Sequence, residues 1–251
     1  MVGVPAHNHM AEKRDLLIEL GILGVMGYFL FFISVAVNPT LGSIYTLPVI
    51  LAIVLAMVDY FFGSKTIKLI SKNLTWTQAI LWGIGGYVAL ILSTQLASGL
   101  AQIIPLKEIL SLLGASAPVF SNSAILNYIS FSFLIAYVET MAFFIIALDL
   151  FASMFKVQIN KQNLFNPKLI LITLGLSLAF MLYHVQAKGI ENESILILVF
   201  FMAVISLFTI IWTQDARPSI LIHVISNSIA SATIFGVVSP LAICLPLMGG
   251  A

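Results

Sequence analysis

The sequence predicts an all-α membrane protein, and three observations carry this prediction. Apolar residues make up 61% of the 251 residues and charged residues only 8%, whereas soluble chains contain about 45–50% and about 25%. Eleven basic and ten acidic side chains are too few to coat a soluble globule of this length. The apolar residues form long continuous stretches, not the alternating pattern of membrane β-strands. We therefore expect a polytopic helix bundle in lipid, and the composition excludes a soluble enzyme, a disordered chain and a nucleic-acid-binding protein.

Seven apolar stretches are long enough, or nearly so, to cross a hydrocarbon core, which needs about 20 helical residues. They cover residues 16–37, 45–62, 78–104, 124–150, 168–187, 195–212 and 219–238. The first is longer than the core of about 7–15 residues in a cleavable signal peptide, so we expect it to be retained. The tail at 241–248 is too short to span alone, but an eighth short segment would reverse the side of the C-terminus. We find no repeat or long linker, and residues 1–251 are expected to form a single integral membrane domain.

Lysine and arginine are distributed unevenly between alternate loops. Nine lie on one predicted side and two on the other: Lys13, Arg14, Lys65, Lys68, Lys72, Lys156, Lys161, Lys168 and Arg217 against Lys107 and Lys188. Because basic loops stay in the cytoplasm, this asymmetry predicts a cytoplasmic N-terminus. A short chain without targeting extensions is typical of a multi-pass protein of a prokaryotic plasma membrane.

Local signals support these boundaries. Asn166-Pro167 combines a favourable N-cap with proline at the first helical position before the fifth span, and Pro218-Ser219 is expected to open the seventh. Between the third and fourth spans, apolar residues within 106–113 recur at helical spacing. We expect a short helix there, lying in the outer interface.

The spans contain few strongly polar residues. Glu139 lies near the middle of the fourth span, His184 in the fifth, and His223 and Asn227 one helical turn apart in the seventh. An ionisable group at this depth costs at least a few kcal/mol, so each needs a partner or a function. Because these helices carry almost no other deep polar groups, the four side chains are expected to converge.

This set of side chains suits amide hydrolysis. A carboxylate and an imidazole can activate a water molecule as a general base, and a second imidazole with a carboxamide can stabilise the oxyanion. A serine or cysteine nucleophile is less well supported, since the chain has no G-x-S-x-G elbow and its one cysteine is Cys244. Zinc is an alternative, with Glu139, His184 and His223 as ligands, although the H-E-x-x-H signature is absent. Two non-enzymatic alternatives remain: a structural subunit whose polar residues bind helices together, and a transporter or proton relay.

The polar residues resemble the motifs of the CPBP family of intramembrane proteases, named for CAAX proteases and bacteriocin-processing enzymes, which includes the type II CAAX prenyl endopeptidases. The family's motifs E-E-x-x-x-R, F-x-x-x-H and H-x-x-x-N lie in that order on successive helices. The second and third match fully, in the segments 180–184 and 223–227. The first matches only at Glu139, because Thr140 replaces the second glutamate and Phe144 the arginine. The resemblance covers approximately residues 120–240.

The resemblance implies an intramembrane endopeptidase. Glu139 and His184 would activate the attacking water, and His223 and Asn227 would hold the oxyanion. No cofactor is expected, and the substrate would be a membrane-associated or lipid-anchored peptide or protein, in contact with membrane lipid. The departures at Thr140 and Phe144 imply the alternative of a catalytically inactive relative, acting as a structural subunit with membrane-protein partners.

Straight helices would separate these groups. At about 1.5 Å per residue, Glu139 would lie about 16 Å from the cytoplasmic side, His184 about 24 Å and His223 about 6 Å. We therefore expect one of two distortions: a polar turn 213–219 that lies below the surface, or a fifth helix that protrudes into the cytoplasm. Separations above about 12 Å would be incompatible with a shared catalytic water.

Overall fold

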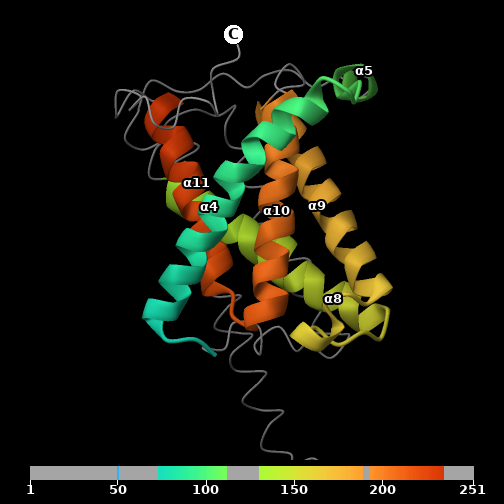
Figure 1. Ribbon diagram of the computed structural model, residues 1–251, viewed down its shortest axis with the longest axis vertical. Coiled ribbons are helices and arrows are strands. Elements are labelled where there is room, and N and C mark those ends of the chain that lie inside the picture. The colour runs from blue at the N-terminus through green and yellow to red at the C-terminus, as the bar shows by residue number, and fades with distance from the viewer. Residues whose placement is uncertain (1–49, 51–72, 112–129, 189–192, 235–251) are drawn as a thin grey trace, which may run out of the picture.

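A computed structural model describes residues 50, 73–111, 130–188 and 193–234, and every regular element in this part of the chain is a helix (Figure 1). The elements are α4 (Trp76–Ala101), α5 (Leu106–Ser111), η1 (Ser130–Ile135), α7 (Ala136–Glu139), η2 (Thr140–Ile146), α8 (Ala147–Met154), η3 (Lys161–Asn163), α9 (Pro167–Lys188), α10 (Glu193–Thr213) and α11 (Arg217–Ile234). The predicted all-α class is confirmed for these residues. The predicted spans 16–37 and 45–62, except residue 50, lie outside them, as do the N-terminus, 235–238 and the tail at 241–248.

Four helices among the described residues are long and apolar enough to cross a membrane. They are α4, the stretch Ala136–Met154, Pro167–Val185 within α9, and α10. These correspond to the third to sixth predicted spans, and they are consistent with a membrane protein. The short helix expected at 106–113 is present as α5, and Leu106 packs in a cluster with residues of α4, α9 and α10.

Side-chain caps define where two of the long helices begin. The Thr75 hydroxyl accepts from the Gln78 backbone at 3.2 Å and the Gln78 side chain accepts from the Thr75 backbone at 2.9 Å, which is a capping box at the start of α4. Asn166 accepts from the Lys168 backbone N–H at 3.0 Å, so the predicted Asn166-Pro167 start of α9 is confirmed. The last helix, α11, begins at Arg217, one residue before the predicted Pro218-Ser219 start.

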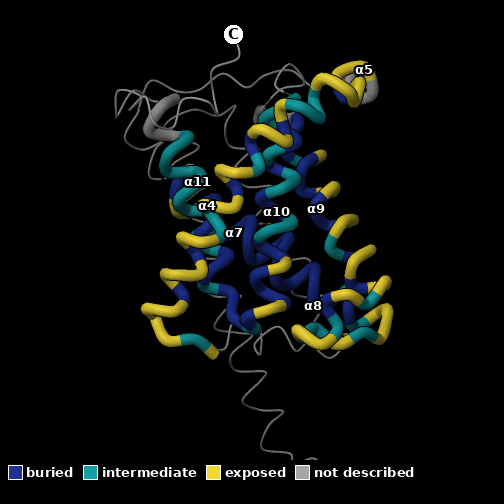
Figure 2. The backbone as a smooth tube through the Cα atoms, viewed as in Figure 1, coloured by how far each residue is buried: buried dark blue, intermediate teal, exposed yellow. Residues whose placement is uncertain are grey.

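The fourth predicted span forms the centre of the bundle. It consists of η1, α7, η2 and α8 in direct succession, with π-helical segments before and after α7. In the most apolar part of Ala136–Met154, 78% of the residues are buried, compared with 22% in α4. Figure 2 shows the same contrast between a buried interior and an exposed outer surface on α4 and α9. Its largest fully buried side chains include Phe144, Met141, Ile145, Ile146 and Leu148. The core of the bundle therefore lies around the helix that carries Glu139.

Glycines on α4 allow α11 to approach closely. A Cβ atom at Gly83 would lie 2.7 Å from Leu221 Cβ, and one at Gly86 would collide with the Ile222 side chain. Gly85 faces open space instead. Small residues at these two positions therefore fix how near α11 lies to α4, and with it the position of His223.

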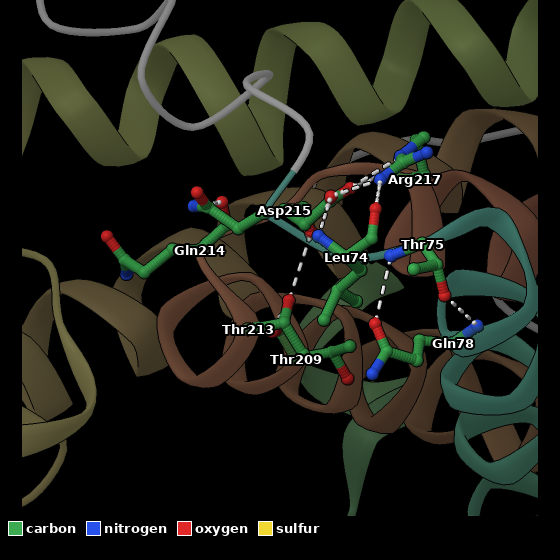
Figure 3. Close-up of polar contacts among 9 residues, drawn as sticks. Leu74, Thr75, Gln78, Thr209, Thr213, Gln214, Asp215 and Arg217 are labelled. Carbon is green, nitrogen blue, oxygen red and sulfur yellow. Dashed lines mark hydrogen bonds and ion pairs between the residues drawn. The ribbon is translucent and has the colours of Figure 1, made fainter.

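The turn between α10 and α11 is fastened to the segment that precedes α4 (Figure 3). Asn73 Nδ2 donates to the Gln214 carbonyl at 2.6 Å, the Leu74 N–H donates to Asp215 Oδ2 at 3.2 Å, and an Arg217 Nη2 donates to the Leu74 carbonyl. Gln214 itself adopts the left-handed conformation, with φ 55°, that reverses the chain at the end of α10. We call this set of contacts the 73–217 clasp.

Basic residues of the described segments divide between the two ends of the bundle. The end where α8 and α10 finish and α9 and α11 begin carries Lys156, Lys161, Lys168 and Arg217, and the opposite end carries Lys107 and Lys188 (Figure 1). The helices alternate in direction as the loop assignment assumed. The side of the membrane that each end faces remains an expectation.

Candidate active site

Three of the four predicted site residues come together in the core. Glu139 is the last residue of α7, His184 lies in the last two turns of α9, and His223 lies in the second turn of α11. The three side chains are buried, with relative exposures of 3%, 7% and 0%. Because three separate helices contribute one group each, the cluster exists only in the folded bundle.

One carboxylate oxygen faces both imidazoles. Glu139 Oε2 lies 3.3 Å from His223 Nε2 and 3.7 Å from His184 Nε2. These separations are far below the limit of about 12 Å set by a shared catalytic water. The side chains of Thr213, Asp215 and Ser219 in the polar turn are all buried.

The F-x-x-x-H spacing has a direct structural role. His184 Nδ1 lies 2.9 Å from the carbonyl oxygen of Phe180, one helical turn earlier. A carbonyl only accepts hydrogen bonds, so Nδ1 carries the proton and Nε2 is the nitrogen that faces Glu139. The Phe180 ring packs against both imidazoles, with centroids 4.3 Å from His184 and 5.6 Å from His223. A single residue therefore orients one histidine and packs against both.

The two positions that depart from the family motif are both in contact with His223. Thr140 Oγ1 lies 3.1 Å from His223 Nδ1, and both residues are fully buried. The Phe144 ring packs 4.8 Å from Phe180 and 6.2 Å from His223. The Phe144 and Phe180 rings keep the surroundings of the cluster low in polarity, where electrostatic interactions are strong.

Some polar atoms of the cluster keep hydrogen-bonding capacity. Glu139 Oε2 and His223 Nε2 are buried, and neither makes a well-aligned hydrogen bond. A buried unpaired polar atom costs about 1–3 kcal/mol, and such atoms gather where a structure binds or reacts. Both atoms are therefore able to bond to a water molecule or to a substrate.

Asn227 lies on α11, half-buried and one turn after His223. The i, i+4 spacing puts the two side chains on the same face of the helix. Tyr183 was not expected at the site, yet it is a hydrogen-bond partner of the Glu139 carboxylate. Its position directly before His184 was the only sequence signal, and adjacent helical residues normally point apart.

Arg217, one of the basic residues of the predicted cytoplasmic side, is held by the 73–217 clasp. It donates to Asp215 Oδ1 at 3.0 Å and Oδ2 at 2.6 Å, and its guanidinium lies 4.6 Å from the Trp76 ring centroid. Burial alone would raise the pKa of Asp215, but hydrogen bonds from Arg217 and from the Leu74 backbone outweigh it and lower that pKa below its usual value. The hydrogen bond with Asp215 raises the pKa of Arg217 in turn.

Zinc was the alternative expected at Glu139, His184 and His223. Within the described ranges, no group of three or more His, Cys, Asp or Glu side chains is placed so that it could hold a metal ion.

Comparison with known proteins adds no relative. No protein-family model matches the chain, and no match is found among curated proteins or solved structures. The resemblance to the CPBP family therefore rests on the motif residues themselves.

Proposed function

We propose that this protein is an intramembrane endopeptidase of CPBP type, which hydrolyses a peptide bond in a membrane-associated or lipid-anchored substrate. The observation that carries the proposal is the placement of Glu139 Oε2 beside Nε2 of both His184 and His223, at 3.7 and 3.3 Å. The site would lie within a bundle of about seven spans in the plasma membrane of a prokaryote, with the N-terminus in the cytoplasm.

The reaction divides the cluster into two functional halves. Glu139 and His184 take a proton from water as its oxygen attacks the peptide carbonyl carbon. The carbonyl oxygen becomes negative and accepts hydrogen bonds from His223 Nε2 and from the Asn227 amide. When the C–N bond breaks, the proton passes from the base to the leaving amine, so that water is consumed and two peptide ends are formed.

A second candidate function is a structural subunit of a membrane complex. The burial of Glu139, His184 and His223 favours it, because a fully packed polar cluster can simply hold three helices in register. In that case the polar groups contribute to stability or to partner binding and turn over no substrate.

Replacement of Glu139 by glutamine distinguishes the two functions. Glutamine keeps the size and polarity of the side chain but cannot act as a base, so a peptidase should lose about 10²- to 10⁴-fold in kcat while its melting temperature changes little. The assay follows cleavage of a quenched fluorogenic peptide library, with and without a C-terminal prenyl group, by the purified protein in lipid nanodiscs. Ser177→Ala is the matched control, because Ser177 is buried but donates only to its own helix, at Thr173.

The possible outcomes of this experiment distinguish the peptidase from the structural subunit. Cleavage by the wild type that is abolished in Glu139→Gln supports the peptidase. If wild type and variant are equally inert and the variant melts earlier or loses a co-purifying membrane protein, the structural subunit is the better description. Chelators decide the role of zinc, since a metal-free site keeps its activity in their presence and a zinc site loses activity that added zinc restores.

A further inference from the structure

We infer that Thr140 is a positioning residue that fixes His223 in the tautomer with its proton on Nε2, and so divides the roles of donor and base between the two histidines. The inference rests on the proposed function for its catalytic meaning, but its structural part stands on hydrogen bonding alone. Thr140 takes the place of the family's second glutamate and is directly bonded to the His223 ring at 3.1 Å.

The Thr140 hydroxyl is bonded differently from other helical hydroxyls in the bundle. Several buried or partly buried ones donate to the carbonyl three or four residues earlier in their own helix: Thr94, Ser177, Thr209, Thr213 and Ser226. Thr140 bonds across to another helix instead. It lies at the junction of α7 and the π-helical η2, where its backbone N–H is shared between the carbonyls of Ala136 and Tyr137. Its backbone N–H therefore keeps bonds of α-helical and 3₁₀ type, while its side chain bonds outside its own helix.

The direction of the Thr140–His223 hydrogen bond follows from satisfying every buried group. If His223 Nδ1 carried the proton, Thr140 would accept and its own O–H would have no acceptor among the residues that the structure describes. An unpaired buried donor costs about 1–3 kcal/mol. The lone pair of His223 Nε2 would also face the Glu139 carboxylate 3.3 Å away. If Thr140 donates, its O–H has an acceptor, and a proton on His223 Nε2 replaces the lone pair that would face Glu139 Oε2.

The two histidines thereby take opposite roles. The Phe180 carbonyl places the His184 proton on Nδ1 and leaves a basic Nε2 beside Glu139. Thr140 places the His223 proton on Nε2, where it can be donated to a developing oxyanion. A neutral hydroxyl is sufficient for this task, so the loss of the family's second carboxylate at this position does not by itself remove the donor.

Selective ¹⁵N labelling of histidine tests the tautomer without any substrate. The protonated and unprotonated ring nitrogens of a neutral imidazole resonate at well-separated frequencies, and single His→Asn variants assign the signals. In the wild type we expect His223 as the Nε2–H form and His184 as the Nδ1–H form. Thr140→Val, which keeps the shape and removes the hydroxyl, should raise the Nδ1–H population of His223. Thr140→Ser should restore the wild-type signal.

The matched control is Thr209→Val, an identical substitution at a buried position whose hydroxyl donates to the Ile205 carbonyl at 2.7 Å. It should leave the His223 signals unchanged. A wild-type His223 with its proton on Nδ1 would overturn the inference, even if Thr140→Val did not fold. An unchanged tautomer in a folded Thr140→Val protein would overturn it as well.

Kinetics provide the second readout. Thr140→Val should lower kcat by about 10- to 100-fold, by analogy with the loss seen when the hydrogen-bond partner of a metal-bound histidine is removed, with KM unchanged and activity recovered in Thr140→Ser. A wild type without peptidase activity contradicts the proposed function and leaves the tautomer measurement valid. An active wild type with a normal tautomer and normal kcat in Thr140→Val contradicts only the role of Thr140.

Discussion

Asn227 is the site residue whose proposed role is most specific to a peptidase. It is half-buried on α11 and shares a face with His223, so in a peptidase its amide would donate to the oxyanion. Asn227→Ala should lower kcat by about 10²- to 10³-fold with little change in KM, as loss of one oxyanion donor does elsewhere. Ser226→Ala is the control, because Ser226 donates only to the Ile222 carbonyl. Equal kinetics for both variants would argue against the oxyanion role.

Asp215 gives the bundle a predictable response to acid. Its lowered pKa means that the folded state favours the carboxylate, so its contribution is complete above the usual aspartate pKa of about 4 and is lost as pH falls through the lower, folded-state value. Asp215→Asn should lose about 1.5–3 kcal/mol at neutral pH, the range for hydrogen bonds to a charged group. Melting temperatures of both proteins in detergent from pH 7 to 3 test this: the difference should shrink toward acid pH. A difference that does not change with pH would contradict the assignment.

Individual residues show how far the sequence could predict the site. Glu139, His184 and His223 were predictable because an apolar span leaves a buried ionisable group few partners other than another such group. The contact of Thr140 with His223 was not, since a helical threonine normally bonds to its own backbone. The engagement of Arg217 with Asp215 and Leu74 was equally unpredictable, because it joins segments about 140 positions apart.

At the scale of elements, close approach of α4 and α11 positions His223. Gly83→Ala would place a Cβ atom 2.7 Å from Leu221 Cβ, and because that atom is bound to the backbone, the helices must separate. We expect a loss of about 1–3 kcal/mol, typical of overpacking, measured as a lower melting temperature in detergent. The proposed peptidase activity should fall with it, since α11 carries His223 and Asn227.

Gly85→Ala is the matched control for this prediction. It is the same substitution two residues away on the same helix, but nothing lies within 4 Å of the added atom. Alanine favours the helix by up to about 1 kcal/mol over glycine, so this variant should melt at the same temperature as the wild type or slightly higher. Equal destabilisation of the two variants would show that helix propensity, not packing, matters here.

Helix existence was predictable from the sequence, but helix type was not. Long apolar stretches and the Asn166-Pro167 cap located α9 within one residue of its observed start. The π-helical segments η1 and η2 gave no signal, because the spacing of their mostly apolar residues does not separate a turn of 3.6 residues from a wider one. A largely apolar sequence therefore identifies a central span but does not indicate whether the span is an α-helix or a π-helix.

At the scale of the whole molecule, the segregation of basic residues predicts the orientation in the membrane. Lys161 and Lys107 are exposed and lie at opposite ends of the bundle. In a Cys244→Ser background, which removes the chain's one cysteine, Lys161→Cys should react with a membrane-impermeant thiol reagent only after the cells are opened. Lys107→Cys should react in intact cells. The reverse pattern would place the basic end outside and contradict the predicted cytoplasmic N-terminus.

The 73–217 clasp also has a consequence for biosynthesis. Leu74 and Asp215 are separated by 141 positions in the chain, and a ribosome adds about 5–20 residues per second. Asp215 is therefore synthesised roughly 7 to 28 s after Leu74, which precedes α4. His223 follows only eight residues after Asp215, so the cluster of Glu139, His184 and His223 cannot form until α11 has been synthesised and has packed against the earlier helices.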